Sequence, residues 1–161
     1  MRTFALKISY FEPQIDDRYM KTNRTNELAV EYILSHPERF KPTKYATYYA
    51  GDDGYLYRIK NNKAYKISGD NSKNNAGYKI TSLQHNGKAH TVTVHTLICE
   101  AFHGPRPIVN GERYTVDHLN GKDDNRPEHL EWVTFKENMR RRAQRSKERI
   151  IKEYLESQSS I

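Results

Sequence analysis

Three polar residues in the last third of the chain could together hydrolyse a phosphodiester bond: Asp117, His118 and Asn138. The Asp117 carboxylate and the Asn138 amide offer oxygen ligands, which suit a hard divalent ion such as Mg²⁺. A neutral His118 imidazole beside such an ion can take a proton from water, and the ion can stabilise charge on the phosphate and the leaving oxygen. An isolated Asp-His pair is more often structural, so this interpretation depends on the elements that carry the three residues.

The last third of the sequence predicts four such elements in order. They are a strand (114–118), a turn-rich loop (119–129), a second strand (130–134) and a helix (135 to about 156). The start of the helix is marked by a capping box, with Thr134 at the N-cap and Glu137 three residues later.

This order can bring the three polar residues together. A helix packed across a two-stranded hairpin can place its first turn, with Asn138, beside the strand end that carries Asp117 and His118. Adjacent strand residues point to opposite faces, so both can act only where the strand bends or ends. The turn-forming sequence after His118 allows this.

The upstream sequence predicts short elements with clear turn signals. These are a strand (2–11), a helix (26–35) capped by Asn26, a linker (37–44), two hairpins (55–60 with 63–67, and 77–83 with 89–94) and a helix (95–103). The turns are predicted at Asn61-Asn62 and at Asn86-Gly87, since Asn-Gly is the strongest short hairpin signal. We expect His95 and Trp132 to be structural residues.

The charge of the chain is unevenly distributed. Its 27 Lys and Arg residues exceed its 20 Asp and Glu residues, for a net charge of +7. Residues 111–134 hold three basic and six acidic residues, between basic segments at 41–110 and 135–161. Basic flanks favour a polyanion such as nucleic acid, and the acidic island favours a metal-assisted site that acts on it. Charge that serves only solubility is the alternative.

Several protein classes are excluded. A membrane helix needs about 20 apolar residues, and no apolar run here exceeds three. The N-terminus lacks the apolar core of a signal peptide. The single cysteine, Cys99, excludes a disulfide framework and a multi-cysteine zinc site, and a zinc site on His118 and His129 would still need about four ligands. We therefore expect a cytoplasmic protein with no membrane partner.

The segment TVDHLNGKDDNRPEHLEWVTFKENM (115–139) resembles the HNH, or ββα-metal, nuclease motif, with the closest similarity to phage and intron-borne HNH homing endonucleases. Upstream, GYKITSL, a Gly-Lys turn and VHTLICEAF (within 77–102) are also similar to segments common in that family. The resemblance covers roughly residues 45–140. It implies a DNA endonuclease that uses one Mg²⁺ or Mn²⁺ ion per active site and acts on double-stranded DNA.

The resemblance also implies residue roles. His118 would be the general base, and Asp117 and Asn138 would bind the metal ion. The middle motif position, usually Asn in the family, is His129, which would orient His118. The loop residues Asp123, Asp124 and Asn125 are expected to build turns rather than to act in catalysis.

Basic residues around this motif are candidates for DNA binding. They are Lys79, Lys88, Lys136, Arg140, Arg141, Arg142 and Arg145. The consecutive arginines directly follow Asn138, which would place guanidiniums near the scissile phosphate. The alternative is a solvated charged helix with internal ion pairs. The two lysines lie on tyrosine-rich hairpins that could face DNA, although packing alone also explains the tyrosines.

We therefore expect an α+β protein, in which a small antiparallel β-rich N-terminal region precedes a ββα-metal (HNH) motif and a basic C-terminal helix. The expected division is a segment of unknown role (1–40), a β-rich DNA-binding region (45–110) and a catalytic region (111–161). The main hypothesis is a metal-dependent, homing-type or phage-encoded nuclease, as a monomer or a homodimer. The alternatives are a catalytically silent DNA-binding regulator and an effector nuclease that binds a protein partner through residues 1–40.

Overall fold

In this computed structural model, the described residues are 27–67 and 72–160. The strand predicted at 2–11 and the N-cap predicted at residue 26 lie outside them. The first described element is helix α2 (Glu27–Ser35), which confirms the helix predicted at 26–35. Its Ile33 side chain is 2% exposed and packs in the protein interior.

A four-stranded antiparallel sheet follows, with the order β1-β2-β3-β4. Its strands are β1 (Phe40–Pro42), β2 (Tyr48–Gly51), β3 (Leu56–Lys60) and β4 (Lys63–Ile67). The β3-β4 turn is the predicted Asn61-Asn62, and both residues have positive φ, as such two-residue turns require. The linker predicted at 37–44 is wrong, because this segment contains β1. Pro42 fits there because β1 is an edge strand.

The sheet separates two apolar clusters because successive strand residues point to opposite faces. On one face, Tyr57 and Ala64 pack with Ile33 of α2 and with Phe40. On the other face, Leu56 belongs to the main core. Helix α2 therefore covers one face of the sheet, and the main core lies on the other face.

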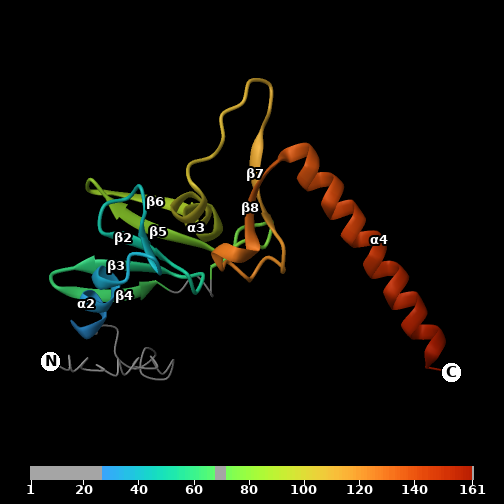
Figure 1. Ribbon diagram of the computed structural model, residues 1–161, viewed down its shortest axis with the longest axis horizontal. Helices are drawn as coiled ribbons and strands as arrows, with labels where there is room; N and C mark the ends of the chain where they lie inside the picture. Colours follow the sequence, from blue (N-terminus) through green and yellow to red (C-terminus); the bar gives the residue numbers. More distant parts are fainter. Residues whose placement is uncertain (1–26, 68–71, 161) are drawn as a thin grey trace, which may run out of the picture.

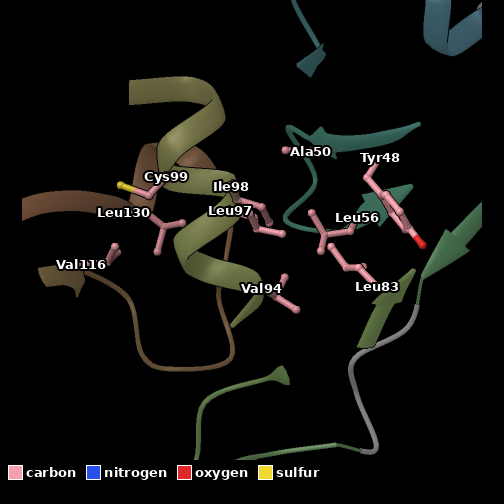
Figure 2. Packing of buried hydrophobic residues seen from close by; sticks show 10 residues of the cluster. All are labelled: Tyr48, Ala50, Leu56, Leu83, Val94, Leu97, Ile98, Cys99, Val116 and Leu130. Atoms are coloured by element: carbon pink, nitrogen blue, oxygen red, sulfur yellow. The ribbon is translucent and has the colours of Figure 1, made fainter. Parts of the chain in front are cut away.

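The main core is built around helix α3 (Val94–His103), as predicted at 95–103. Figure 2 shows α3 with apolar side chains from the sheet on one side and Val116 and Leu130 on the other. The hairpin before it consists of β5 (Ile80–His85) and β6 (Lys88–Thr93). Its turn is the predicted Asn86-Gly87, although both strands extend closer to that turn than expected.

The C-terminal third has the predicted order of strand, loop, strand and helix. It consists of β7 (Tyr114–His118), the 3₁₀ helix η1 (Pro127–His129), β8 (Leu130–Thr134) and α4 (Phe135–Ser159). The Thr134 hydroxyl caps α4 by accepting a hydrogen bond from the backbone N–H of Glu137 at 3.1 Å. The α+β fold class is confirmed.

Within residues 27–67 and 72–160, α4 contacts the body through its first turns, as far as Arg145, and the helix then extends away from the body (Figure 1). Four apolar residues near its end are exposed: Ile150, Ile151, Tyr154 and Leu155. Among the described residues, no helix is both long and apolar enough to cross a membrane.

Candidate active site

Strand β7 places Asp117 and His118 at its end and directs them to opposite sides. Both side chains are buried, with exposed fractions of 2% for Asp117 and 7% for His118. Asp117 contacts α4, whereas His118 contacts α3 and the loop that follows β7. The strand ends at His118, as the turn sequence predicted, but the two side chains keep the alternation of a regular strand.

The Asp117 carboxylate is held by two guanidiniums of α4. Arg145 donates to both carboxylate oxygens, at 2.8 and 2.7 Å, and Arg141 donates to one of them at 3.2 Å. Burial alone would raise the pKa of Asp117, but its hydrogen bonds and ion pairs with Arg145 and Arg141 outweigh burial and lower that pKa. Asp117 is therefore a buried carboxylate with cationic partners on both oxygens.

The His118 imidazole is fixed on its Nε2 side by Asn125. Its Nε2 lies 2.9 Å from Asn125 Oδ1, which can only accept a hydrogen bond, so Nε2 carries the proton in this arrangement. In the neutral imidazole, Nδ1 then has a free lone pair. Burial lowers the pKa of His118, although the Asn125 hydrogen bond and the Asp117 charge oppose this shift. His118 is therefore neutral at pH 7 and can accept a proton at Nδ1.

Two further rings enclose His118. Tyr78 stacks on it with the ring centroids 5.4 Å apart, and His95 of α3 meets it edge-on at 4.8 Å. His95 is itself buried, and burial followed by the His118 charge lowers its pKa to about 3. His95 therefore packs as a neutral ring, in agreement with its predicted structural role.

Asn125, which the sequence analysis expected only to build a turn, is the loop residue that contacts His118. It is 3% exposed, and its loop lies against the turn between β2 and β3. A Cβ on Gly54, which has φ +82°, would lie 2.8 Å from Asn125 C and from Arg126 N. The close approach of this turn supports the loop backbone that carries Asn125. No local sequence signal reports such a contact between distant segments.

His129 does not contact His118 among the described residues. Its Nδ1 lies 2.7 Å from Asp124 Oδ2, and Asp124 also accepts hydrogen bonds from Arg126 and Asn120. These bonds tie the loop to itself, and the Arg126 hydrogen bond is the main cause that lowers the pKa of Asp124. Asp124 thus builds a turn, as predicted, and His129 braces this loop while Asn125 holds His118.

Asn138 lies on the same face of α4 as the two arginines that bind Asp117. Positions 138, 141 and 145 are spaced by three and four residues, the spacing of neighbours along one helix face. Asn138 is 6% exposed, and its amide makes no side-chain hydrogen bond within the described part of the chain. The α4 face toward β7 therefore carries one amide oxygen with no protein partner and two cations that bind the nearby carboxylate.

The oxygen donors fit a hard divalent ion, which prefers carboxylate and amide ligands. The Asp117 oxygens are already bonded to Arg145 and Arg141, so an ion would have to displace these guanidiniums. The residues described here contain no group of three or more His, Cys, Asp or Glu that could hold a metal ion. An ion at this site would therefore take few protein ligands, as Mg²⁺ commonly does when it retains water and binds phosphate.

The predicted DNA-binding arginines have three different settings. Arg140 pairs with Glu137 in a bidentate contact at 2.8 Å, and Arg141 and Arg145 turn toward Asp117. Arg142 and Lys136 are exposed on α4. Lys88 is exposed at the β5-β6 turn, while Lys79 is half-buried with its ammonium 5.7 Å from the Tyr55 ring. The three consecutive arginines therefore do not act as one surface cluster.

Comparisons with known proteins agree with this geometry. Residues 92–140 match a family model described as HNH endonuclease, and this range includes Asp117, His118, Asn125 and Asn138. No match was found among curated proteins.

A solved structure titled "DNA binding and cleavage by the HNH homing endonuclease I-HmuI" is similar over 67% of this chain, with 32% sequence identity and a TM-score of 0.53. The match covers 59% of that protein's chain, so this chain spans about three fifths of its length. Residues 92–140 are therefore similar to the HNH endonuclease family in sequence, and the chain is similar in structure to a solved HNH homing endonuclease.

Proposed function

We propose that this protein is a metal-dependent DNA endonuclease in which His118 activates the attacking water. The observation that carries this proposal is the contact between His118 Nε2 and Asn125 Oδ1 at 2.9 Å. It holds a neutral, buried imidazole with Nδ1 available as a proton acceptor, at the end of the strand that also carries Asp117.

The chain's own residues perform four tasks in this mechanism. His118 Nδ1 takes a proton from water as the oxygen attacks the phosphorus, and Asn125 keeps Nε2 protonated and the ring in place. Tyr78 and His95 limit rotation of the ring and exclude water around it. Asp117 and Asn138 would hold one Mg²⁺ or Mn²⁺ ion, which supplies stabilisation of negative charge on the phosphate and the leaving oxygen when bound.

The proposed substrate is double-stranded DNA, supported by the basic composition of α4 and by what the similar homing endonuclease binds and cleaves according to its title. The exposed Lys136, Arg142 and Lys88 suit phosphate contacts that position the duplex without reading sequence. Arg141 and Arg145 can turn to phosphate if they leave Asp117. We also propose a homing-type or phage-encoded origin and an intracellular place of action, where such a substrate is found.

The described residues of one chain form one such site, so a monomer would nick one strand and a homodimer could cut both.

We also propose that residues 1–40 bind a protein partner. The described part of this segment is packed on the sheet through Ile33 and Phe40. Truncation before α2 is therefore a cleaner test of a partner than truncation at residue 41, which would remove buried side chains.

A plasmid assay tests the proposal. Wild type, His118→Ala and His36→Ala are each incubated with supercoiled plasmid in Mg²⁺, in Mn²⁺ and in EDTA. We expect open-circle product from wild type and from His36→Ala, whose histidine lies at the end of α2, and no product in EDTA or from His118→Ala. Cleavage by His118→Ala at the wild-type rate would contradict the proposed role of His118.

A catalytically silent DNA-binding protein is the second candidate. It is favoured by one observation, that the Asp117 carboxylate is occupied by Arg145 and Arg141. Salt-sensitive DNA binding without cleavage in either metal ion, across several DNA substrates, would support this candidate over the nuclease.

A further inference from the structure

The ion pair between Asp117 and Arg145 joins a buried anion to a cation that solvent can reach. The Asp117 side chain is 3% exposed, whereas the Arg145 side chain is 41% exposed. Arg145 makes no other salt bridge with the described residues, while Arg141 also pairs with Glu131 at 2.7 Å and with Glu137 at 2.9 Å. A phosphate group can therefore reach Arg145 from outside while Asp117 stays covered.

The same carboxylate is a proposed metal ligand, so guanidinium and metal ion compete for one pair of oxygens. Arg145 engages both oxygens in a bidentate contact, at 2.8 and 2.7 Å, which is the strongest form of an Arg–carboxylate pair. If the Arg145 guanidinium leaves, the buried Asp117 carboxylate keeps only the longer contact with Arg141, at 3.2 Å on Oδ2, which is unfavourable unless another cation replaces Arg145. Loss of Arg145 and arrival of a divalent ion are thus coupled by charge.

DNA supplies the groups that can draw Arg145 away. Guanidinium binds phosphate in the same bidentate manner as carboxylate. Arg145 follows Asn138 by seven residues along one face of α4, so a backbone phosphate brought to the proposed metal site also lies near the Arg145 side chain. The exchange leaves Arg145 on phosphate and frees Asp117 Oδ1 for the ion, because Arg141 bonds only Oδ2.

We propose that Arg145 is a positioning residue that couples metal binding to DNA binding: in the free protein it holds Asp117 and weakens metal binding, and on DNA it transfers to phosphate and releases the carboxylate. This inference rests on the proposed metal-dependent function and adds a reason why the free protein would bind metal weakly. The coupling is reciprocal, so metal and DNA strengthen each other's binding by the same factor, which is about 5- to 150-fold for such linkage.

Mn²⁺ binding measured by electron paramagnetic resonance tests this without any cleavage step. The full chain is titrated as wild type, as Arg145→Gln and as Arg149→Gln, without DNA. Arg149→Gln is the matched control, because it removes the same charge one turn further along α4 from an exposed pair with Glu153. We expect Mn²⁺ affinity to rise at least tenfold in Arg145→Gln and to stay within about twofold of wild type in Arg149→Gln.

A second arm adds duplex DNA at low salt in a His118→Ala background, with the Mn²⁺ bound by DNA alone subtracted. DNA should raise Mn²⁺ affinity in the protein that retains Arg145 and have little effect once Arg145 is glutamine. If Arg145→Gln folds poorly, Arg145→Lys keeps the charge but loses the bidentate contact, and it should give a smaller gain in affinity.

Equal Mn²⁺ affinities in Arg145→Gln and Arg149→Gln would overturn the coupling, even if plasmid cleavage proves metal-dependent. Absence of Mn²⁺ binding in every variant, with and without DNA, would overturn both the coupling and the proposed metal site. Cleavage data alone decide the nuclease function, so the two proposals fail in distinguishable ways.

Discussion

Replacing Asn125 with alanine removes the one acceptor that holds His118 Nε2–H, at 2.9 Å in a buried pair. The buried N–H loses its partner, which costs about 1–3 kcal/mol, and the imidazole loses the bond that fixes its tautomer and orientation. Residues that orient a catalytic or metal-binding histidine in this way typically contribute about 10- to 100-fold to activity. We expect a loss of this size in the single-turnover rate, with DNA affinity unchanged.

The aspartate variant separates orientation from charge. Asn125→Asp keeps an acceptor for Nε2–H and adds a negative charge, which favours protonated His118 and raises its pKa. Wild-type activity should persist below pH 6.5, the ordinary value for histidine, because burial lowers the pKa of His118. In Asn125→Asp, the acidic limb of the pH–rate profile should move to higher pH.

The assay is single-turnover cleavage across pH 5 to 9 with thermal unfolding of each variant as a check of folding. Asn110→Ala is the matched control, since Asn110 is an exposed loop asparagine. An Asn125→Ala variant that folds normally, cleaves within twofold of wild type and has an unchanged pH profile would refute the assigned role of Asn125.

Three further predictions concern stability and the support of the site. The pKa of His95 is 6.5 in the unfolded chain and about 3 in the folded protein. The free energy of unfolding therefore decreases as the pH falls between these two values. Between pH 7.5 and pH 5 His95 should contribute about 2 kcal/mol to the loss of unfolding free energy measured with urea, and His95→Phe should remove this contribution while that of His118 remains. Thr134→Ala should lower the free energy of unfolding by about 1 kcal/mol through loss of the α4 cap, and Thr134→Ser should restore most of it. Gly54→Ala should slow cleavage as well as destabilise, because its Cβ meets the backbone at Asn125, whereas Gly111→Ala, with positive φ but open space around it, should only destabilise by about 1 kcal/mol.

The elements of the site could be predicted from sequence because each is marked locally. Asn86-Gly87 predicts a hairpin turn, and Thr134 with Glu137 predicts the start of a helix, so β5, β6 and α4 follow from neighbouring residues alone. Strand β1 was missed for the opposite reason. It has three residues, ends at Pro42, and is held by pairing with β2 and by burial of Phe40, which no local pattern reports.

The path of the loop between β7 and β8 was the main limit on predicting the site. Sequence spacing places both Asn125 and His129 near His118, and only the three-dimensional course of the loop shows that Asn125 makes the contact. The direction of the arginines could have been predicted. Positions 138, 141 and 145 share one helix face, so a side chain that meets Asn138 also meets Arg141 and Arg145.

The most direct test of His118 as the general base is chemical rescue. His118→Ala should reduce the single-turnover cleavage rate by about 100- to 10,000-fold, with DNA affinity retained. Added imidazole should then restore part of the rate, by entering the space left by the buried ring and accepting the proton from water. A His118→Ala variant that cleaves DNA at the wild-type rate, with or without imidazole, would contradict the assignment of this site as the centre of catalysis.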